Sequence, residues 1–396
     1  MNPANHQDGA APQVLRVAFI INDLDLGGAE RMLLKVSSRL SPAIRPIVLS
    51  LARNGKLNEE FEAAGIPVTD LAISGIGSLP GGLWRGWKAL RRFRPEVCNT
   101  WMYHADLIGG LLARAAGTKA VAWNIRNSNL DPSRSSLATR VLVRVNAMLS
   151  RRLPARIICC AQVAQRVHVE IGYDGSRFVH VPNGFDTDAF RPDAEARVAI
   201  RRELGIANDV PLIGLVARWH AQKDHRNFVR AATLLRHDFP QAHFMLVGQG
   251  CDSDNEILAR WLSTDALTDH FHLLGPRTDI ARLTAALDIA TSSSASGEAF
   301  PNTLGEAMAC GIPCVTTDVG DSGAVIGDTG YLVPAHDSHA LANAWKAVLL
   351  LPTDERAKLG LAARERVEMH FDLNSIARTY ESLFFELARG QKQCVV

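Results

Sequence analysis

Two carboxylates that bracket the start of a predicted helix offer the clearest chemistry in this sequence. The stretch from Ser296 to Pro313 places Glu298 in a glycine-containing loop and Glu306 on the helix expected to follow, with seven residues between them. Pro301 suits the first turn of that helix, because its missing N–H is not needed there. The amides around this helix N-terminus should attract an anion, phosphate above all, and they belong to Ala299, Phe300, Asn302 and Thr303. Carboxylates beside an anion site predict a ligand that carries both phosphate and hydroxyl groups, as a sugar nucleotide does.

This stretch resembles the signature of the retaining glycosyltransferases of family 4, which have the GT-B fold. The signature is a glutamate, seven residues and a second glutamate. The resemblance implies that Glu298 contacts hydroxyls of the donor sugar and that Glu306 binds the ribose of the nucleotide. Ala299 stands where the family often has glycine, and only the backbone amide is needed at that place. The alternative is a capped surface helix with two solvated glutamates.

Two cations follow a strand expected over residues 211–217. Arg218 and Lys223 have four residues between them, and together they could neutralise a diphosphate, Arg218 as a fork and Lys223 as a point charge. The pair resembles a family segment in which arginine and lysine, each beside a glycine, stabilise the leaving diphosphate. Ala217 and Asp224 stand in place of those glycines. A solvated basic loop is the alternative.

Further candidates lie beyond other strands of the first half. Gly27 and Gly28 open a helix and allow close approach of a phosphate or sugar, but no third glycine completes a dinucleotide fingerprint. The resemblance implies a contact with donor phosphate or acceptor, and a purely structural turn fits these residues equally well. His104 follows a strand over 97–101 and could donate to a sugar hydroxyl. Its alternatives are a capping role or stacking on Trp101.

Three more residues are weaker candidates. Arg126, after a strand over 120–125, could contact the acceptor or the donor. Gly248 and Arg277 lie in loops that end strands of the second half, and the resemblance implies that these loops line the nucleotide base. For the two arginines, a solvated surface cation is the alternative.

Alternating apolar strands and helices predict the fold class, which is α/β with parallel sheets covered by helices. Two doubly wound, Rossmann-like domains facing across a cleft form the GT-B arrangement that the resemblance implies. After a lead of residues 1–13, expected to be disordered, we predict an acceptor-side domain over 14–182 and a donor domain over 183–371. A helix within 372–396 should cross back to the first domain. The expected strands are 15–21, 46–51, 68–71, 97–101, 120–125, 156–160, 211–217, 243–247, 271–273, 289–291, 314–316 and 331–333.

Composition indicates an ordinary globular protein of 396 residues with 43 Lys and Arg against 41 Asp and Glu. No leader-peptide pattern and no apolar run long enough to span a bilayer is present, so we expect a cytoplasmic location. The seven cysteines are scattered, which is typical of reduced thiols.

Charge is divided unevenly along the chain. Residues 1–190 hold 23 Lys and Arg against 15 Asp and Glu, a net charge of +8, whereas residues 191–396 carry a net charge of −6. The segment from Trp84 to Arg94 combines two tryptophans with five cations and suits a helix lying on an anionic lipid surface. A solvated helix with its tryptophans packed on the sheet is the alternative. No reading helix or aromatic-studded groove indicates nucleic acid.

The hypothesis from sequence is a retaining glycosyltransferase at the inner face of the membrane. It would transfer a sugar from a nucleoside diphosphate to a hydroxyl of a glycan acceptor, lipid-linked in our hypothesis, as in lipopolysaccharide biosynthesis. No obligatory metal or other cofactor is expected, because Asp252 and Asp254 lie in a helix-opening loop and no convincing metal motif stands beside the cations. No residue suggests a covalent nucleophile, and the resemblance implies front-face attack. The alternatives are a GT-B sugar-nucleotide epimerase and a catalytically idle subunit of a glycan-assembly complex.

Overall fold

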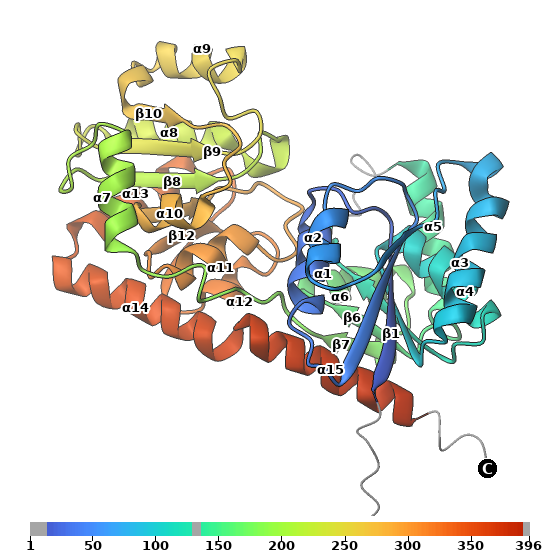
Figure 1. Cartoon of the computed structure of the whole chain (residues 1–396). Helices are drawn as coiled ribbons and strands as arrows, with labels where there is room; N and C mark the ends of the chain where they lie inside the picture. The colour runs from blue at the N-terminus through green and yellow to red at the C-terminus, as the bar shows by residue number, and fades with distance from the viewer. Residues whose placement is uncertain (1–13, 129–135, 391–396) are drawn as a thin grey trace, which may run out of the picture.

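Two parallel β-sheets, each covered by helices, form the computed structural model, which describes residues 14–128 and 136–390 (Figure 1). Every pair of neighbouring strands within the two sheets is parallel, so helices or loops must cross over between strands. The predicted fold class of two doubly wound α/β domains is therefore confirmed. The lead predicted over residues 1–13 lies outside the described residues.

The first sheet contains seven strands in the order β3-β2-β1-β4-β5-β6-β7. Its order reverses between β1 and β4, and strands β4 and β5 are buried along their whole length. In sheets of this kind, ligands bind beyond the carboxyl ends of the strands at such a reversal. The strands are β1 (Leu15–Ile21), β2 (Ile44–Ser50), β3 (Val68–Asp70), β4 (Val97–Trp101), β5 (Ala120–Ile125), β6 (Arg156–Cys159) and β7 (Phe178–His180).

The second sheet contains six strands in the order β10-β9-β8-β11-β12-β13, with the reversal between β8 and β11. Its core includes aromatic rings packed between the sheet and its helices, such as Phe228 and Trp345 at 5.0 Å between ring centroids. The strands are β8 (Leu212–Val216), β9 (His243–Val247), β10 (Phe271–Leu273), β11 (Ile289–Ser292), β12 (Cys314–Thr317) and β13 (Gly330–Val333).

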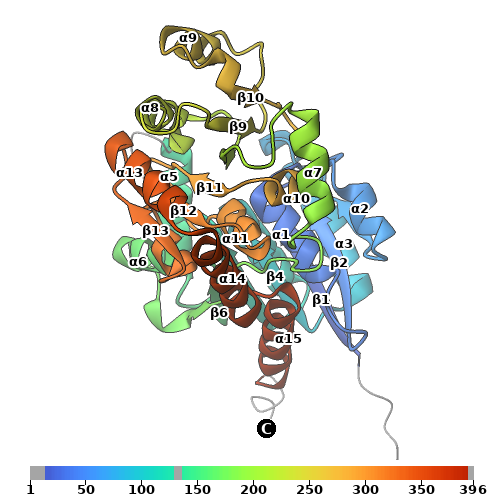
Figure 2. The same ribbon diagram turned by 90° about the vertical axis from the view of Figure 1, so that its left-hand side faces the viewer.

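Helices follow the strands in both domains (Figures 1 and 2). In the first domain they are α1 (Gly28–Ser37), α2 (Asn58–Ala63), α3 (Leu79–Phe93), the π-helical η2 (Ala105–Gly109), α4 (Gly110–Ala115), α5 (Leu137–Leu149) and α6 (Gln162–Ile171), with short 3₁₀ turns at η1 (Ile76–Ser78) and η3 (Gly175–Arg177). Later helices are α7 (Ala194–Glu203), α8 (His225–Leu235), α9 (Glu256–Thr264), α10 (Ile280–Ala285), α11 (Asn302–Ala309), α12 (Ser322–Ile326), α13 (Ser338–Leu350), α14 (Thr353–His370) and α15 (Leu373–Arg389), with 3₁₀ turns at η4 (Ala221–Lys223) and η5 (Thr268–His270).

The chain passes from one domain to the other in two adjoining segments. Phe185, in the first crossing, exchanges backbone hydrogen bonds with the second crossing: its N–H donates to Phe371 at 2.7 Å, and its carbonyl accepts from Leu373 at 3.0 Å. Beyond this point, α15 packs against the first domain. Phe384 lies 5.8 Å from Phe19, between ring centroids, and the ring of Tyr380 stacks near Trp101.

Two elements of the first domain deserve a physical account. Helix α1, which Gly27 and Gly28 were predicted to open, ends at Ser37, whose hydroxyl donates to the carbonyl of Leu33 at 2.7 Å. Serines that bond their own backbone favour helix ends. The edge strand β7 was not predicted at all, because it has only three residues and none of them is buried.

Candidate functional site

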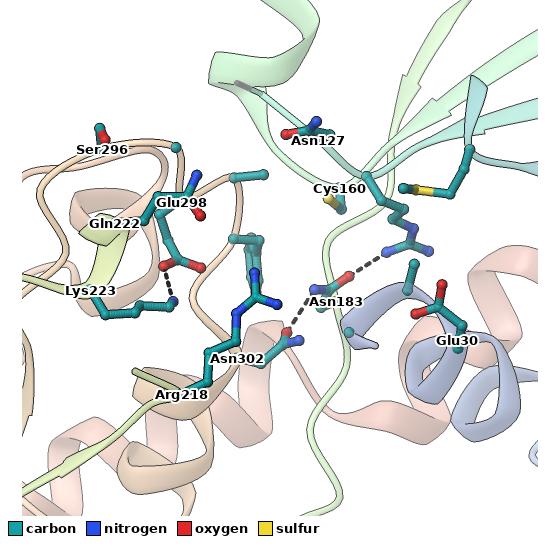
Figure 3. Close-up of a pocket in the computed structure, with 17 residues that line it drawn as sticks. Glu30, Asn127, Cys160, Asn183, Arg218, Gln222, Lys223, Ser296, Glu298 and Asn302 are labelled. Atoms are coloured by element: carbon teal, nitrogen blue, oxygen red, sulfur yellow. Dashed lines mark hydrogen bonds and ion pairs between the residues drawn. The ribbon is translucent and has the colours of Figure 1, made fainter. Parts of the chain in front are cut away.

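A pocket lies between the two domains, at the carboxyl ends of strands from both sheets (Figure 3). Residues that directly follow β4, β5 and β6 line it from the first domain, and the loops after β8 and β11 line it from the second. Its lining consists of Gly28, Ala29, Glu30, Met102, Arg126, Asn127, Cys160, Asn183, Arg218, Gln222, Lys223, Ser296, Gly297, Glu298, Ala299, Phe300 and Asn302. Most of the predicted site residues are therefore brought together, although their sequence positions extend from Gly28 to Asn302.

The donor loop, defined as residues 296–301, leads into α11 and forms part of the second-domain wall of this pocket. One detail of the prediction is wrong: Pro301 is not in the first turn but precedes it, with ψ at 96°, and α11 begins at Asn302. Pro301 therefore occupies the N-cap position, outside the first turn of α11. No side chain caps α11, so the amides of its first residues, Asn302 and Thr303, keep the polarity that attracts an anion.

The two predicted cations differ in their surroundings. Lys223 forms an ion pair with Glu298, whose carboxylate also accepts a hydrogen bond from the hydroxyl of Ser294 at 3.0 Å. The exposed side chain of Arg218 makes no ion pair or hydrogen bond with another described residue, and it points into the pocket in Figure 3. Arg218 is thus available to an anion, whereas Lys223 already forms an ion pair with Glu298.

Arg126 lines the pocket, but its guanidinium is strongly engaged. It hydrogen bonds the side chain of Asn183 and donates to the hydroxyl of Tyr380 at 2.5 Å, while its charge lies 4.2 Å from the ring centre of Trp101. Asn183 in turn donates to the side chain of Asn302 at 2.7 Å. Figure 3 shows the hydrogen bond between Asn183 and Asn302 at the start of α11. Arg126 therefore links the domains as well as facing the pocket.

Glu306 and Thr303 do not line the main pocket but a small adjoining cavity beside α10 and α11. The carboxylate of Glu306 accepts a bond from Lys35 of α1 at 3.1 Å, so it too is paired with a cation of the first domain. A ligand that reached Glu306 with hydroxyl groups would compete with this ion pair.

Four other predicted residues lie outside the pocket lining. His104 is exposed next to the η2 segment, and Gly27 precedes α1 with the Glu30 side chain folded over it. Gly248 has a φ of 146° and lies so close to Ala217 that a side chain there would overlap its carbonyl. Arg277 donates to Asp279 and to Glu203, and these hydrogen bonds raise the pKa of its guanidinium. Gly248 and Arg277 thus have clear structural partners.

Sequence reasoning missed several polar residues of the pocket, namely Glu30, Asn127, Asn183, Gln222 and Ser296. Glu30 is only 8% exposed, and its burial, helped by the nearby Asp23 and Asp25, raises the pKa of its carboxyl. Its place in the Gly-Gly-Ala-Glu segment was the available indication. Asn183 is the first residue of the predicted donor domain, and its place in the pocket depends on partners 57 and 119 residues away.

Within residues 14–128 and 136–390, no group of three or more histidine, cysteine or acidic side chains is arranged to hold a metal ion. The six cysteines in these ranges are unbridged thiols. None of the helices described there is long and apolar enough to cross a membrane.

Comparisons with known proteins agree with this architecture. The model of Glycosyltransferase Family 4 matches residues 26–189, and that of glycosyl transferases group 1 matches residues 210–350. The Escherichia coli UDP-Gal:alpha-D-GlcNAc-diphosphoundecaprenol alpha-1,3-galactosyltransferase is 22% identical, over 68% of this chain and 69% of its own length. The D-inositol 3-phosphate glycosyltransferase of Corynebacterium jeikeium is 29% identical, over 69% of this chain and 72% of its own.

Comparison with solved structures also agrees with this architecture. The crystal structure of Anabaena Alr3699/HepE in complex with UDP aligns with a TM-score of 0.84 and 22% identity, over 94% of this chain and 100% of that one. The same protein has been solved with UDP-glucose. This likeness shows that the two chains share one fold.

Proposed function

The chain belongs to the family 4 glycosyltransferases of the GT-B fold, and from that premise we propose a retaining enzyme that uses a nucleoside-diphosphate sugar. The acceptor in this proposal is a hydroxyl of a lipid-linked glycan destined for the bacterial cell surface. Family membership favours sugar transfer over the epimerase and binding-subunit alternatives. The observation that carries the proposal is the pocket in which Arg218, Lys223 and the N-terminus of α11 converge beside Glu298.

The donor diphosphate binds between Arg218, Lys223 and the first amides of α11 in this proposal. Negative charge grows on the diphosphate as the sugar departs, and preorganised cations and amides stabilise it most at that moment. Lys223 then leaves Glu298, and Glu298 becomes free to accept hydrogen bonds from the donor sugar. In the proposed mechanism the acceptor oxygen attacks from the face that the diphosphate leaves, and its hydroxyl proton passes to the departing diphosphate. This route requires neither a covalent nucleophile nor an obligatory metal ion.

Support for UDP as the nucleotide comes from the Anabaena protein, which was solved with UDP and with UDP-glucose. Support for a lipid-linked acceptor comes from the name of the Escherichia coli relative, whose acceptor is a diphosphoundecaprenol-linked sugar. The surface of the first domain adds an independent reason.

That surface combines exposed apolar and basic side chains on α3 and α5. Trp84 of α3 is 62% exposed and stacks on Trp87 at 5.2 Å, and Leu137 and Met148 of α5 are 69% and 78% exposed. One flank of α3 lines an apolar groove against α4, and the other lines a groove rich in cations, among them Lys88, Arg92 and Arg94. We propose that this face, on the cytoplasmic side, docks on anionic lipid and presents the pocket to the acceptor.

Donor screening followed by product analysis tests this function. Melting temperatures with UDP-, GDP- and ADP-sugars identify the donor that stabilises the protein, since a ligand that binds the folded state raises stability. Proton NMR of the first sugar released or transferred from an α-linked donor then reveals its configuration. An α product supports the retaining mechanism. A β product contradicts it, and a lack of stabilisation by all of these donors contradicts the proposed donor class.

A further inference from the structure

Asp321 joins the two domains through a contact that no predicted site residue makes. It lies between β12 and α12 and is only 5% exposed. Its carboxylate accepts from the backbone N–H of Gln162 at 2.6 Å and from that of Val163 at 3.0 Å. These are the first two residues of α6 in the other domain. The N-cap of α6 is Ala161, which has no side-chain acceptor, so a carboxylate 159 residues away takes the capping role.

The backbone next to this carboxylate holds the donor loop. The N–H of Asp321 donates to the carbonyl of Ala299 at 3.1 Å. Gly320 has a φ of 66° and passes so close beneath the loop that a Cβ would overlap the carbonyl of Glu298. From the first domain, the hydroxyl of Ser128 donates to that same Glu298 carbonyl at 3.1 Å. The loop that carries Glu298 is thus held from both domains, and Asp321 touches the loop and the opposite domain at once.

We propose that Asp321 is a positioning residue that couples closure of the two domains to the placement of the donor loop. Its carboxylate meets the positive end of α6 only when the domains are together, because both donors belong to the first domain. Its amide meanwhile fixes Ala299, so closure and the position of Glu298 are linked through one residue. Asp321 does not line the pocket itself. The expected effect on sugar transfer rests on the proposed function. The link between domain closure and the donor loop rests on the contacts alone.

Kinetics separate this role from substrate binding. Because Arg218, Lys223 and the start of α11 remain in place, Asp321→Ala should leave the Kd for UDP nearly unchanged. Its kcat for sugar transfer should fall about tenfold or more, as expected when charge-assisted hydrogen bonds that position a reacting group are lost. Asp318→Ala is the matched control, since Asp318 is exposed and lies three residues earlier in the same loop.

Hydrogen–deuterium exchange of the full chain tests the contact without any need for activity. The amides of Gln162 and Val163 should exchange about tenfold faster in Asp321→Ala than in the parent, because each loses its acceptor. They should remain protected in Asp318→Ala. The measurement is made with the protein alone and repeated with UDP.

A variant of the opposite domain completes the test. Gln162→Pro removes one of the two donors, and proline is tolerated at the first position of a helix. Ala161 before it has φ −141° and ψ 139°, which suits a residue preceding proline. Gln162→Ala keeps the N–H and is the control. Asp321→Ala should lower kcat less in the Gln162→Pro background than in the parent, since one bond is already missing.

The outcomes distinguish this inference from the proposed function. Faster exchange at both amides, a lower kcat and non-additive effects with Gln162→Pro support it. Unchanged exchange in Asp321→Ala, or additive effects of the two substitutions, overturns it even if the parent transfers sugar normally. A parent protein that transfers no sugar overturns the proposed function instead, while exchange still reports the contact.

Discussion

At the scale of single residues, the charged side chains of the pocket region differ in whether they already form an ion pair. Arg218 is exposed and without an ion pair among the described residues, whereas Lys223 is paired with Glu298 and Glu306 with Lys35. In the proposed mechanism, a diphosphate meets Arg218 first and draws Lys223 away from its ion pair with Glu298. Until then, that ion pair and the hydrogen bond from Ser294 hold the Glu298 carboxylate in one orientation.

Arg218→Ala should lower kcat about 100-fold, because a donor to the charge that develops on the leaving diphosphate is lost. Steady-state kinetics with the donor identified above measures the effect. Arg230→Ala is the control, since Arg230 is exposed on α8 away from the pocket lining. An Arg218→Ala enzyme with the kcat of the parent would show that this cation does not act in the transition state.

The two glutamates should separate binding from turnover. Glu306→Ala should weaken binding of the nucleoside diphosphate about tenfold or more, since ribose hydroxyls lose a charged acceptor. Glu298→Ala should instead reduce kcat while the diphosphate binds at least as well, because Lys223 is freed from its pair. Calorimetry with UDP, GDP and ADP provides the affinities. Unchanged affinity of Glu306→Ala for all three would refute the ribose assignment.

At the scale of elements, apolar strands could be predicted well and long-range partners could not. Strands such as 97–101 and 120–125 are mainly apolar, each with one buried asparagine, and the structure has them at those bounds. The exact start of α11 depended on whether Pro301 lies inside or outside the first turn, which local sequence leaves open. Contacts such as those of Arg126 with Tyr380, 254 residues away, depend on how the domains pack and have no local pattern.

Helix α6 also carries a buried histidine that should make stability depend on pH. Burial lowers the pKa of His168 from 6.5 to about 4, so the folded chain keeps it neutral while the unfolded chain gains a proton below pH 6.5. The unfolded state then binds more protons, and stability falls as pH drops from 7 toward 4. This residue alone should lower the free energy of unfolding by about 2 kcal/mol between pH 7 and pH 5.

Denaturant unfolding at both pH values measures this dependence. His168→Gln should reduce the loss of stability on acidification, whereas the exposed His180→Gln should leave it as in the parent. His225 and His272, whose pKa values burial also lowers to about 4, should account for part of the remainder. Equal acid sensitivity of His168→Gln and the parent would contradict the neutral, buried state of this ring.

At the scale of the whole molecule, the basic half of the chain coincides with the domain that exposes Trp84 and the apolar side chains of α5. An enzyme that acts on a free, soluble sugar has no need of such a face. Docking by this domain would place the acceptor side of the pocket near the lipid, while the more acidic second domain stays in solution and binds the donor.

Flotation with vesicles tests the docking. The parent should float with anionic vesicles at low salt and less at high salt, because each cation near the surface contributes about 1 kcal/mol and salt screens it. Replacing Lys88, Arg91 and Arg92 by Gln should weaken binding about 100-fold. Replacing three exposed cations of the second domain, Arg202, Arg260 and Lys358, should have little effect. Equal failure to float with anionic and neutral vesicles would remove the docking proposal and leave the transfer chemistry intact.

The central claim is that Arg218, Lys223 and the N-terminus of α11 hold the diphosphate of the donor. Calorimetric titration of UDP, GDP and ADP, each beside its nucleoside, tests it most directly. One diphosphate should bind the parent about 100-fold or more tightly than its nucleoside, since charged hydrogen bonds to the phosphates are worth at least that much. The double variant Arg218→Ala/Lys223→Ala should lose this preference. Equal affinity for diphosphate and nucleoside in the parent, or an undiminished preference in the double variant, would contradict the account.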